Sequence, residues 1–417
     1  MDKLVINGQR KLNGIVEISG AKNAVLPVMV ATLLAPGKYR ISRVPNLRDT
    51  HTMLRLLEMI GAKGSFENNE LLIDTTNASN PEAPYDLVKT MRASFYVLGP
   101  LIARFGYARV SLPGGCAWGP RPVNFHISAL EAMGAHIELD EGYVIAKADL
   151  LKGANITFGF PSVGATGNAV MAAVLADGET VIQNAACEPE ISCLCNFLNA
   201  MGAQISGVGS EKLKIKGVEQ LTPIDYEIIP DRIEAATFLI AGAMVGESIT
   251  LKGVNPDHLT SIIEKLHACG QEITSTEDSV TITKMGPIMA VDMSTAVYPG
   301  FPTDVQAQWM ALMTVSEGTS IITDTVYHDR FTHVSELSRF GAWITMKDNV
   351  AVVSGRKKLK GAPVMSTDIR ASASLILAGL AAQNRTDISR IYHIDRGYER
   401  IEEKLRKLGA DILRESE

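Results

Sequence analysis

The sequence predicts a mixed α/β (α+β) protein built from six βαβαββ repeats, three in each of two domains. A helix that ends at a glycine and leads into a short strand recurs through the chain. The glycines are 73, 68, 68, 71 and 68 residues apart, a spacing too regular for chance. With 417 residues, the chain is long enough for two or three domains with sizeable cores. The repeat glycines are Gly61, Gly134, Gly202, Gly270, Gly341 and Gly409.

Each repeat shows the same order of elements. A short strand follows the glycine, and a second strand comes next, as at 71–73, 143–145 and 280–282. An Ala-rich helix follows, as at 165–176 and 371–382, and its small apolar residues predict that it is buried. A further strand, as at 179–182 and 320–322, then a loop and a second helix lead to the next glycine.

The two ends of the chain indicate how the repeats divide. The chain stops soon after the repeat that begins at Gly409, and residues 4–6 match the second strand of a repeat. Residues 1 to about 20 should therefore complete that last repeat and bring the termini together. We expect one domain over 21–229 and a second over 1–20 plus 230–417. The chain would cross between them near Gly20 and Pro230, with the active site in the inter-domain cleft.

The composition excludes several classes of protein. The net charge of −6 argues against a general nucleic-acid or membrane-surface binder, which would carry a basic excess. The N-terminus lacks a signal-peptide pattern, and the apolar stretches are too short to span a membrane. The five cysteines show neither disulfide nor metal-ligand spacing. We therefore expect a soluble cytoplasmic protein without a metal site.

The segment 111–122 is the most unusual stretch of the chain. It places Cys116 in a run of Gly and Pro, with Arg121 five residues further on. Such a run favours neither helix nor strand, and functional residues concentrate on loops of this kind. A thiol beside a cation can have a lowered pKa and act as a nucleophile or proton donor. Locally, Cys116 could equally be a small buried apolar residue.

Cations stand at helix starts and in the loops before the second helices, where helix propensity does not favour them. A cation there opposes the helix dipole, and a bound anion between the two relieves the repulsion. Arg48, Arg121 and Arg396 all lie 13 residues before their repeat glycine. Asp304 follows a second Gly/Pro-rich turn and is either a general base or the ion-pair partner of an arginine. We expect a site for a phosphate-like anion formed by Lys22, Arg92, Arg121, Arg330, Arg370 and Arg396.

Five segments together resemble the UDP-N-acetylglucosamine 1-carboxyvinyltransferase (enolpyruvyl transferase) family, and the resemblance covers the whole chain. It implies that family's two-domain fold, an inside-out α/β barrel. It also implies transfer of the enolpyruvyl group of phosphoenolpyruvate to the 3-hydroxyl of UDP-N-acetylglucosamine. Phosphate leaves through a tetrahedral intermediate, in the first committed step of peptidoglycan synthesis. These two small molecules would be the partners, with no metal or organic cofactor. The segments are 19–24, 89–94, 113–122, 188–190 and 299–304.

The resemblance also implies roles for individual residues. Cys116 would deliver a proton to the substrate methylene and can form a covalent phospholactoyl adduct, while Asp304 would accept the proton of the sugar hydroxyl. Lys22, Arg121 and Arg396 would hold the phosphate of phosphoenolpyruvate, and Arg92, Arg330 and Arg370 would support substrate charge. The other substrate-binding residues would be Asn23 near the reacting hydroxyl, Pro122, Val123, Asn124, Phe125 and Val326 around the nucleotide, and Ser162, Val163 and Gly164.

Two other functions remain open. An enolpyruvyl transferase acting on shikimate 3-phosphate would share the fold, but it would need neither the cysteine loop nor a nucleotide pocket. A six-repeat clamp-like binding protein would line its ring with basic helix faces, whereas these cations gather at loops and helix starts. Small departures from the usual family pattern, at Trp118, Pro120, Tyr96 and Arg48, leave the closure of the cysteine loop open.

Overall fold

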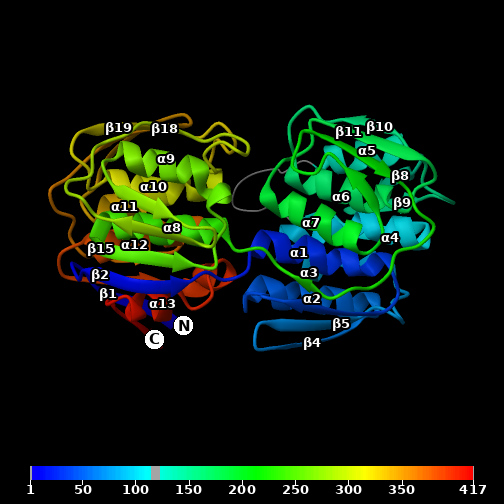
Figure 1. Ribbon diagram of the computed structural model, residues 1–417, viewed down its shortest axis with the longest axis horizontal. Coiled ribbons are helices and arrows are strands. Elements are labelled where there is room, and N and C mark those ends of the chain that lie inside the picture. Colours follow the sequence, from blue (N-terminus) through cyan, green and yellow to red (C-terminus); the bar gives the residue numbers. More distant parts are fainter. Residues whose placement is uncertain (1, 114–122, 417) are drawn as a thin grey trace. The chain divides into compact units, whose positions relative to one another are not determined.

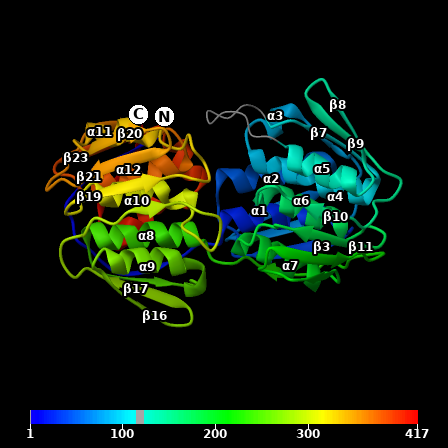
Figure 2. The ribbon, with the colours of Figure 1, turned by 90° about the horizontal axis from the view of Figure 1, so that it is seen from above.

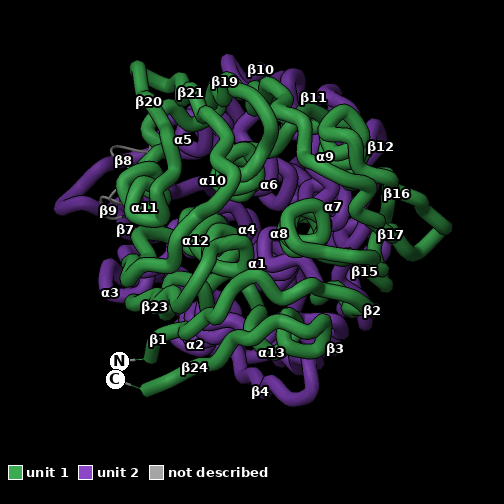
Figure 3. The backbone as a smooth tube through the Cα atoms, turned by 90° about the vertical axis from the view of Figure 1, so that its left-hand side faces the viewer, with its two compact units in different colours: residues 1–19, 230–417 green, residues 20–229 purple. Residues whose placement is uncertain are grey.

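The computed structural model describes residues 2–113 and 123–416, so the predicted site residues Cys116, Arg121 and Pro122 lie outside the described residues. The chain forms two compact units, shown in different colours in Figure 3. Unit 1 comprises residues 1–19 and 230–417, and unit 2 comprises residues 20–229. Each unit has its own apolar core.

Each unit contains three four-stranded sheets with one common topology (Figure 1). In every sheet the first two strands are parallel, and the remaining neighbours are antiparallel. In unit 2 the strand orders are β14-β3-β5-β4, β6-β7-β9-β8 and β10-β11-β13-β12. In unit 1 they are β2-β15-β17-β16, β18-β19-β21-β20 and β22-β23-β1-β24. The predicted fold class, with six repeats and three in each unit, is confirmed.

The strands are short, and their inward side chains are apolar. In unit 2 they are β3 (Lys38–Ser42), β4 (Lys63–Glu67), β5 (Glu70–Asp74), β6 (Glu82–Ala83), β7 (Tyr107–Ser111), β8 (His136–Asp140), β9 (Tyr143–Lys147), β10 (Asn155–Thr157), β11 (Glu179–Gln183), β12 (Gln204–Ser206), β13 (Lys212–Lys216) and β14 (Tyr226–Glu227). In unit 1 they are β1 (Asp2–Asn7), β2 (Leu12–Glu17), β15 (Gly246–Lys252), β16 (Glu272–Ser275), β17 (Ser279–Thr283), β18 (Met293–Ser294), β19 (Thr319–Thr323), β20 (Trp343–Lys347), β21 (Val350–Ser354), β22 (Pro363–Met365), β23 (Arg385–Ser389) and β24 (Asp411–Ser416).

The helices of each repeat cover the inner face of its sheet. Unit 2 contains α1 (Lys22–Ala31), α2 (Arg48–Ile60), α3 (Tyr85–Val88), α4 (Leu98–Phe105), α5 (Asn124–Ala132), α6 (Val163–Ala173) and α7 (Pro189–Ala200), with 3₁₀ turns η1 (Thr32–Leu34) and η2 (Arg92–Val97). Unit 1 contains α8 (Arg232–Val245), α9 (Thr260–Ala268), α10 (Gln306–Met313), α11 (His333–Arg339), α12 (Ile369–Ala381) and α13 (Ile401–Lys407), with η3 (Pro256–Leu259), η4 (Thr303–Val305) and η5 (Ile391–Arg396).

The Ala-rich helices are buried, as their composition predicts. In unit 1, α8, α10 and α12 pack on one another, and Figure 2 shows them side by side within the ring of sheets of that unit. Nearly every position of α8 and α12 is buried. The small side chains of these helices allow their backbones to approach closely. The starts of these helices therefore come close together. Those starts carry Asp231, Asp304 and Arg370.

The repeat glycines end their helices in the left-handed backbone region. Their φ angles lie between 83° and 106°, a range that a residue with a Cβ rarely adopts. The N-terminal segment completes unit 1, because β1 pairs with both β23 and β24, and β2 pairs with β15. The expectation that the two termini meet in the last repeat is therefore confirmed.

Candidate active site

Asp304 lies between two arginines in unit 1. Its turn, η4, leads into α10, and its carboxylate accepts a hydrogen bond from each guanidinium. Arg330 Nη1 lies 2.8 Å from Oδ1, and Arg370 Nη2 lies 3.0 Å from Oδ2. The Arg370 side chain is only 4 % exposed, while that of Asp304 is 25 % exposed. The carboxylate thus stays accessible while it neutralises a deeply buried cation.

The charges at this cluster fix the ionisation of Asp304. Burial by itself would raise the pKa of this carboxyl, but Arg370 and Arg330 lower it by a larger amount, so the pKa of Asp304 lies well below its usual range. Burial would also lower the pKa of Arg370, and Asp304 raises it above the ordinary value. Asp304 is therefore a carboxylate at neutral pH. While both arginines hold it, it is a weak base.

A second buried carboxylate, Asp324, holds the loops around this cluster. Its Oδ1 accepts hydrogen bonds from Thr295 Oγ1 at 2.7 Å and from the backbone N–H groups of Val326 and Tyr327 at 3.0 and 2.7 Å. Its Oδ2 accepts one from Thr303 Oγ1 at 2.7 Å. The same Thr303 hydroxyl accepts a hydrogen bond from Arg330 at 3.1 Å. Asp324 therefore ties the turn that carries Asp304 to the loop that carries Val326 and Arg330.

We expect Asp324→Asn to lower kcat by about 10- to 100-fold, because displacing catalytic groups by about 1 Å costs that much. The amide keeps the shape of the side chain, but its Nδ2 cannot accept a hydrogen bond. Steady-state kinetics and thermal unfolding would be measured together. The control is Asp292→Asn, since Asp292 is exposed and accepts a hydrogen bond from Ile321 N at 2.7 Å on the same sheet. A loss of thermal stability with unchanged kcat would contradict the positioning role.

Arg370 also contacts Tyr398, which belongs to a buried hydrogen-bond network with Thr237 and Gln308. The Tyr398 hydroxyl is hydrogen-bonded to Thr237 Oγ1 at 2.9 Å and accepts from Gln308 Nε2 at 3.1 Å. Arg370 lies over the Tyr398 ring, 5.7 Å from its centroid. Gln308 also donates to the backbone oxygen of Asp304 at 3.0 Å. Arg396 ends η5, and the next residue, Gly397, lies against Ile369 and Arg370 at the start of α12, so Arg396 belongs to the same end of unit 1.

In unit 2, Lys22 forms a buried ion pair. Lys22 is the first residue of α1, and its Nζ lies 2.7 Å from Asp49 Oδ2 in the first turn of α2. Both side chains are buried. The carboxylate is stabilised at the start of α2 by the helix dipole, and it compensates the cation at the start of α1. Asn23, the next residue of α1, is half-buried.

The starts of α5 and α6 lie together in unit 2, which brings two predicted segments next to each other. The Phe125 ring lies 5.9 Å from the ring of Phe158, which precedes α6. Ser162 caps α6 through a hydrogen bond from Ala165 N at 3.3 Å. Gly164 faces His126 so closely that a Cβ there would lie 3.1 Å from the imidazole. Val123 and Asn124 precede Phe125 at the same end of α5.

Arg92 begins η2, and its charge acts on two neighbouring rings. Burial and, to a smaller extent, the charge of Arg92 together lower the pKa of His126 to about 3, so this imidazole is neutral. Its Nδ1 is hydrogen-bonded to Asn168 Nδ2 at 2.8 Å. The Tyr96 hydroxyl, also near Arg92, donates to the Val163 backbone oxygen at 3.3 Å. Arg92 is therefore close to the 162–164 segment.

The structure thus gathers the described site residues into two groups. In unit 1, Asp304 is in direct contact with Arg330 and Arg370. Asp324 connects Val326 to this group, and Arg396 lies on a neighbouring turn. In unit 2, the second group consists of Phe125, Arg92 and the 162–164 segment around His126. Three supporting residues were missed by the sequence reasoning: Asp324, Asn168 and His126. The equal spacing of Arg48 and Arg396 does not give them equal places, because Arg48 begins α2 whereas Arg396 ends η5 well before α13.

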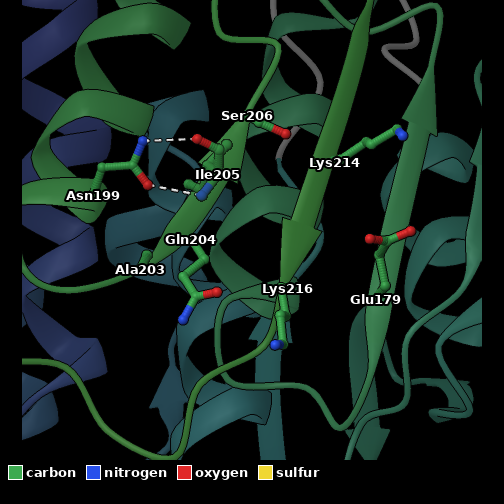
Figure 4. Close-up of a pocket in the computed structure, with 8 residues that line it drawn as sticks. All are labelled: Glu179, Asn199, Ala203, Gln204, Ile205, Ser206, Lys214 and Lys216. Carbon is green, nitrogen blue, oxygen red and sulfur yellow. Dashed lines mark hydrogen bonds between the residues drawn. The ribbon is translucent and has the colours of Figure 1, made fainter.

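A separate pocket lies on the outer face of another sheet of unit 2. It has a volume of about 470 Å³ and is lined by residues of β11, β12, β13 and the end of α7, with Lys214 and Lys216 beside Glu179 (Figure 4). Asn199 holds the backbone of Ile205 there through two hydrogen bonds of 2.9 and 2.8 Å. No residue predicted for the active site lines this pocket.

The described residues contain neither a cluster of metal-binding side chains nor a membrane-spanning helix. Within 2–113 and 123–416, no three His, Cys, Asp or Glu residues gather as a metal site would need. Among the helices of these ranges, none is both long and apolar enough to cross a membrane.

Several curated proteins are similar to this chain over its full length. The UDP-N-acetylglucosamine 1-carboxyvinyltransferase of Chloroherpeton thalassium is 56 % identical, over 100 % of this chain and 98 % of that protein. The proteins of the same name from Chlorobaculum parvum and Geotalea uraniireducens are each 54 % identical, over 100 % of this chain and 99 % and 100 % of theirs. The chain belongs to the UDP-N-acetylglucosamine 1-carboxyvinyltransferase family.

The UDP-N-acetylglucosamine 1-carboxyvinyltransferase family shares its fold with other enolpyruvyl transferases. Residues 6–405 match the EPSP synthase (3-phosphoshikimate 1-carboxyvinyltransferase) family. The enolpyruvyl transferase NikO of Streptomyces tendae superposes with a TM-score of 0.89 at 27 % identity, over 99 % of this chain and 98 % of that one. EPSP synthase from Acinetobacter baumannii gives 0.77 at 18 % identity over the full length of both chains, a likeness of fold alone.

Proposed function

We propose that this protein transfers the enolpyruvyl group of phosphoenolpyruvate to the 3-hydroxyl of UDP-N-acetylglucosamine, releasing phosphate. The observation that carries the proposal is the contact of Asp304 with Arg330 and Arg370, in a chain at least 53 % identical to eight relatives of that name. Arginines suit a substrate with phosphate and carboxylate groups, because their planar fork binds such anions in a bidentate manner. Both substrates are small and soluble, which fits an enzyme of the cytoplasm.

The reaction requires three proton transfers. The sugar hydroxyl loses its proton to Asp304 as its oxygen bonds to C2 of phosphoenolpyruvate. The methylene carbon gains a proton from Cys116, and a tetrahedral intermediate results. The Cys116 thiolate then takes a proton from the new methyl group. The C–O bond to phosphate breaks with its electron pair leaving on phosphate, and the enol ether and phosphate are released. The family resemblance assigns the proton donor, since Cys116 lies outside the described residues.

The arginine contacts give Asp304 a way to become basic when substrate is present. In the free protein two guanidinium groups stabilise the carboxylate, which lowers its pKa and weakens it as a base. An anionic substrate that takes over Arg330 and Arg370 as partners would withdraw this stabilisation, so the pKa of Asp304 rises. In this proposal the carboxylate accepts the hydroxyl proton only after the anion is bound.

The family resemblance assigns the other residues that bind substrate. Lys22, Arg121 and Arg396 hold the phosphate of phosphoenolpyruvate, and Arg92 supports substrate charge. Asn23 binds the sugar. The nucleotide and the remaining substrate contacts are made by Pro122, Val123, Asn124, Phe125, Val326, Ser162, Val163 and Gly164. In support, Gly164 and Phe125 lie on adjoining helix starts.

Phosphate release from phosphoenolpyruvate tests the proposed function. The purified chain is given either UDP-N-acetylglucosamine or shikimate 3-phosphate as acceptor, and free phosphate is followed over time. We expect release with the nucleotide sugar alone. Release with shikimate 3-phosphate alone would assign the chain to the other branch of the fold, and no release with either acceptor would reject an enolpyruvyl transferase.

A further inference from the structure

The outer face of one sheet in unit 1 carries large apolar side chains. Trp343 of β20, Ile321 of β19 and Val352 of β21 are 63 %, 46 % and 38 % exposed. Ile321 is directly opposite Val352, and Trp343 is diagonal to Val352, within reach of an aromatic ring. These residues, with Thr345 and Lys347 of β20, are called the β20 face below.

The six repeats provide an internal control for this face. The first residue of each outermost strand points outward, and at this position the other five strands carry Lys63, His136, Gln204, Glu272 and Asp411. Further outward carboxylates occur on β4, β8 and β24, and β12 borders the lysine-bearing β13. Charges of this kind protect a sheet edge from pairing with another chain. The described β20 has an indole in that place and no carboxylate.

The edge of β20 is available for pairing. The strand is the last of its sheet, and its ladder partner among the described residues is β21. Its five residues are all at least partly exposed. A strand edge with unpaired N–H and C=O groups and few charges is a template for another strand.

The sequence of β20 is complementary to itself in an antiparallel alignment centred on Thr345. This register places Trp343 opposite Lys347 of a second copy, and the same pair forms twice about a twofold axis. An ammonium over an indole is a favourable cation–π contact, and Arg356 already lies 5.7 Å from the centroid of this ring. On the other face of the strand, Ile344 falls opposite Met346. No like charges are opposed in this register.

We propose that two copies of this chain associate through their β20 strands, which joins two four-stranded sheets into one continuous sheet across a twofold axis. We choose a second copy as the partner of β20 because each pair of opposite residues in the alignment is favourable. The Trp343 indole faces the Lys347 ammonium, Ile344 faces Met346, and Thr345 faces its own copy. The interface belongs to unit 1 and uses none of the residues assigned to catalysis. It is independent of the proposed function.

Sedimentation velocity and light scattering on the full chain test the proposal. The wild-type mass should approach twice the monomer mass of 45.0 kDa as concentration rises. Trp343→Asp should remain monomeric, since Asp occupies the matched position of β24 as Asp411 and the strand tolerates it there. The control is Ile15→Asp, which removes a 59 % exposed apolar residue from the edge strand β2 of the same unit and should leave the dimer intact.

A cross-link locates the twofold axis and does not depend on the strength of association. Under oxidising conditions Thr345→Cys should give a covalent dimer whose peptide is joined to its own copy at position 345. Thr274→Cys, at the matched position of β16, should not. A wild-type chain that stays monomeric, or a dimer that persists in Trp343→Asp, would overturn the proposal. Equal cross-linking at both positions would overturn it as well.

Discussion

Replacing Cys116 by alanine should abolish turnover while nucleotide-sugar binding is retained. A general acid contributes about 10²- to 10⁴-fold to rate, so a loss of that size in kcat is expected. Binding of UDP-N-acetylglucosamine, measured by calorimetry, should change little, because the thiol acts on the other substrate. Unchanged turnover would show that the thiol is not the proton donor.

The same thiol should be the one that reacts with epoxides resembling phosphoenolpyruvate, such as fosfomycin. Burial raises the pKa of Cys195 and of Cys269 to about 12, and it also raises the pKa of Cys193 and Cys187. These four thiols are therefore protonated and poor nucleophiles at neutral pH. Mass spectrometry of a digested, treated sample should find the adduct on the Cys116 peptide. Cys187→Ala, which removes the least buried of the four, should leave labelling unchanged.

Asp304→Asn should lower kcat by about 10²- to 10⁴-fold, because the base that accepts the hydroxyl proton is lost. The variant should also be less stable, since Arg370 is then a buried cation without its carboxylate. Removing one partner of a buried pair costs about 3–5 kcal/mol. Because Asp304 is partly exposed, the lower end of that range is expected. Denaturant unfolding and steady-state kinetics measure the two effects separately.

Arg330→Gln separates the role of Asp304 as a base from its role as the ion-pair partner of the arginines. Removing one guanidinium raises the pKa of Asp304 toward its ordinary value, while the carboxylate itself remains. In the wild type, protonation of Asp304 should not reduce kcat/KM as pH falls toward 5, because its pKa lies far below that range. In Arg330→Gln the acid limb of the kcat/KM profile should move to higher pH. If the acid limbs of the wild-type and Arg330→Gln profiles coincide, Arg330 does not set the ionisation of Asp304.

The repeat architecture could be predicted because its signals are local. A glycine that must adopt positive φ and an Ala-rich helix that must be buried both leave a pattern in the residues nearby. Both patterns then recur six times, which fixes the number of repeats. Counting strands at the two ends of the chain predicted that the N-terminal segment completes the last repeat, and the structure places β1 between β23 and β24 there.

The contacts within the site could be predicted only in part. An ion pair between Asp304 and an arginine was one of two alternatives, but the sequence did not indicate that two arginines hold it. Asp324 resembles an ordinary turn residue after a strand, because its partners Thr295 and Thr303 are far away in sequence. The equal spacing of Arg48 and Arg396 from their repeat glycines does not show where each lies relative to its helix, because α2 begins at Arg48 whereas α13 begins only at Ile401. The role of Cys116 comes from the family resemblance.

The pairing of β1 with β23 and β24 has a consequence for synthesis on the ribosome. All of unit 2 lies within residues 20–229, so it can fold as soon as that stretch has emerged. Among the described strands, in contrast, the first strand pairs only with β23 and β24, so its partners are not made until residues 385–416 have been synthesised. The nascent chain therefore carries an unpaired apolar strand for most of its synthesis. A chain cut before residue 411 would leave that strand without its edge partner β24.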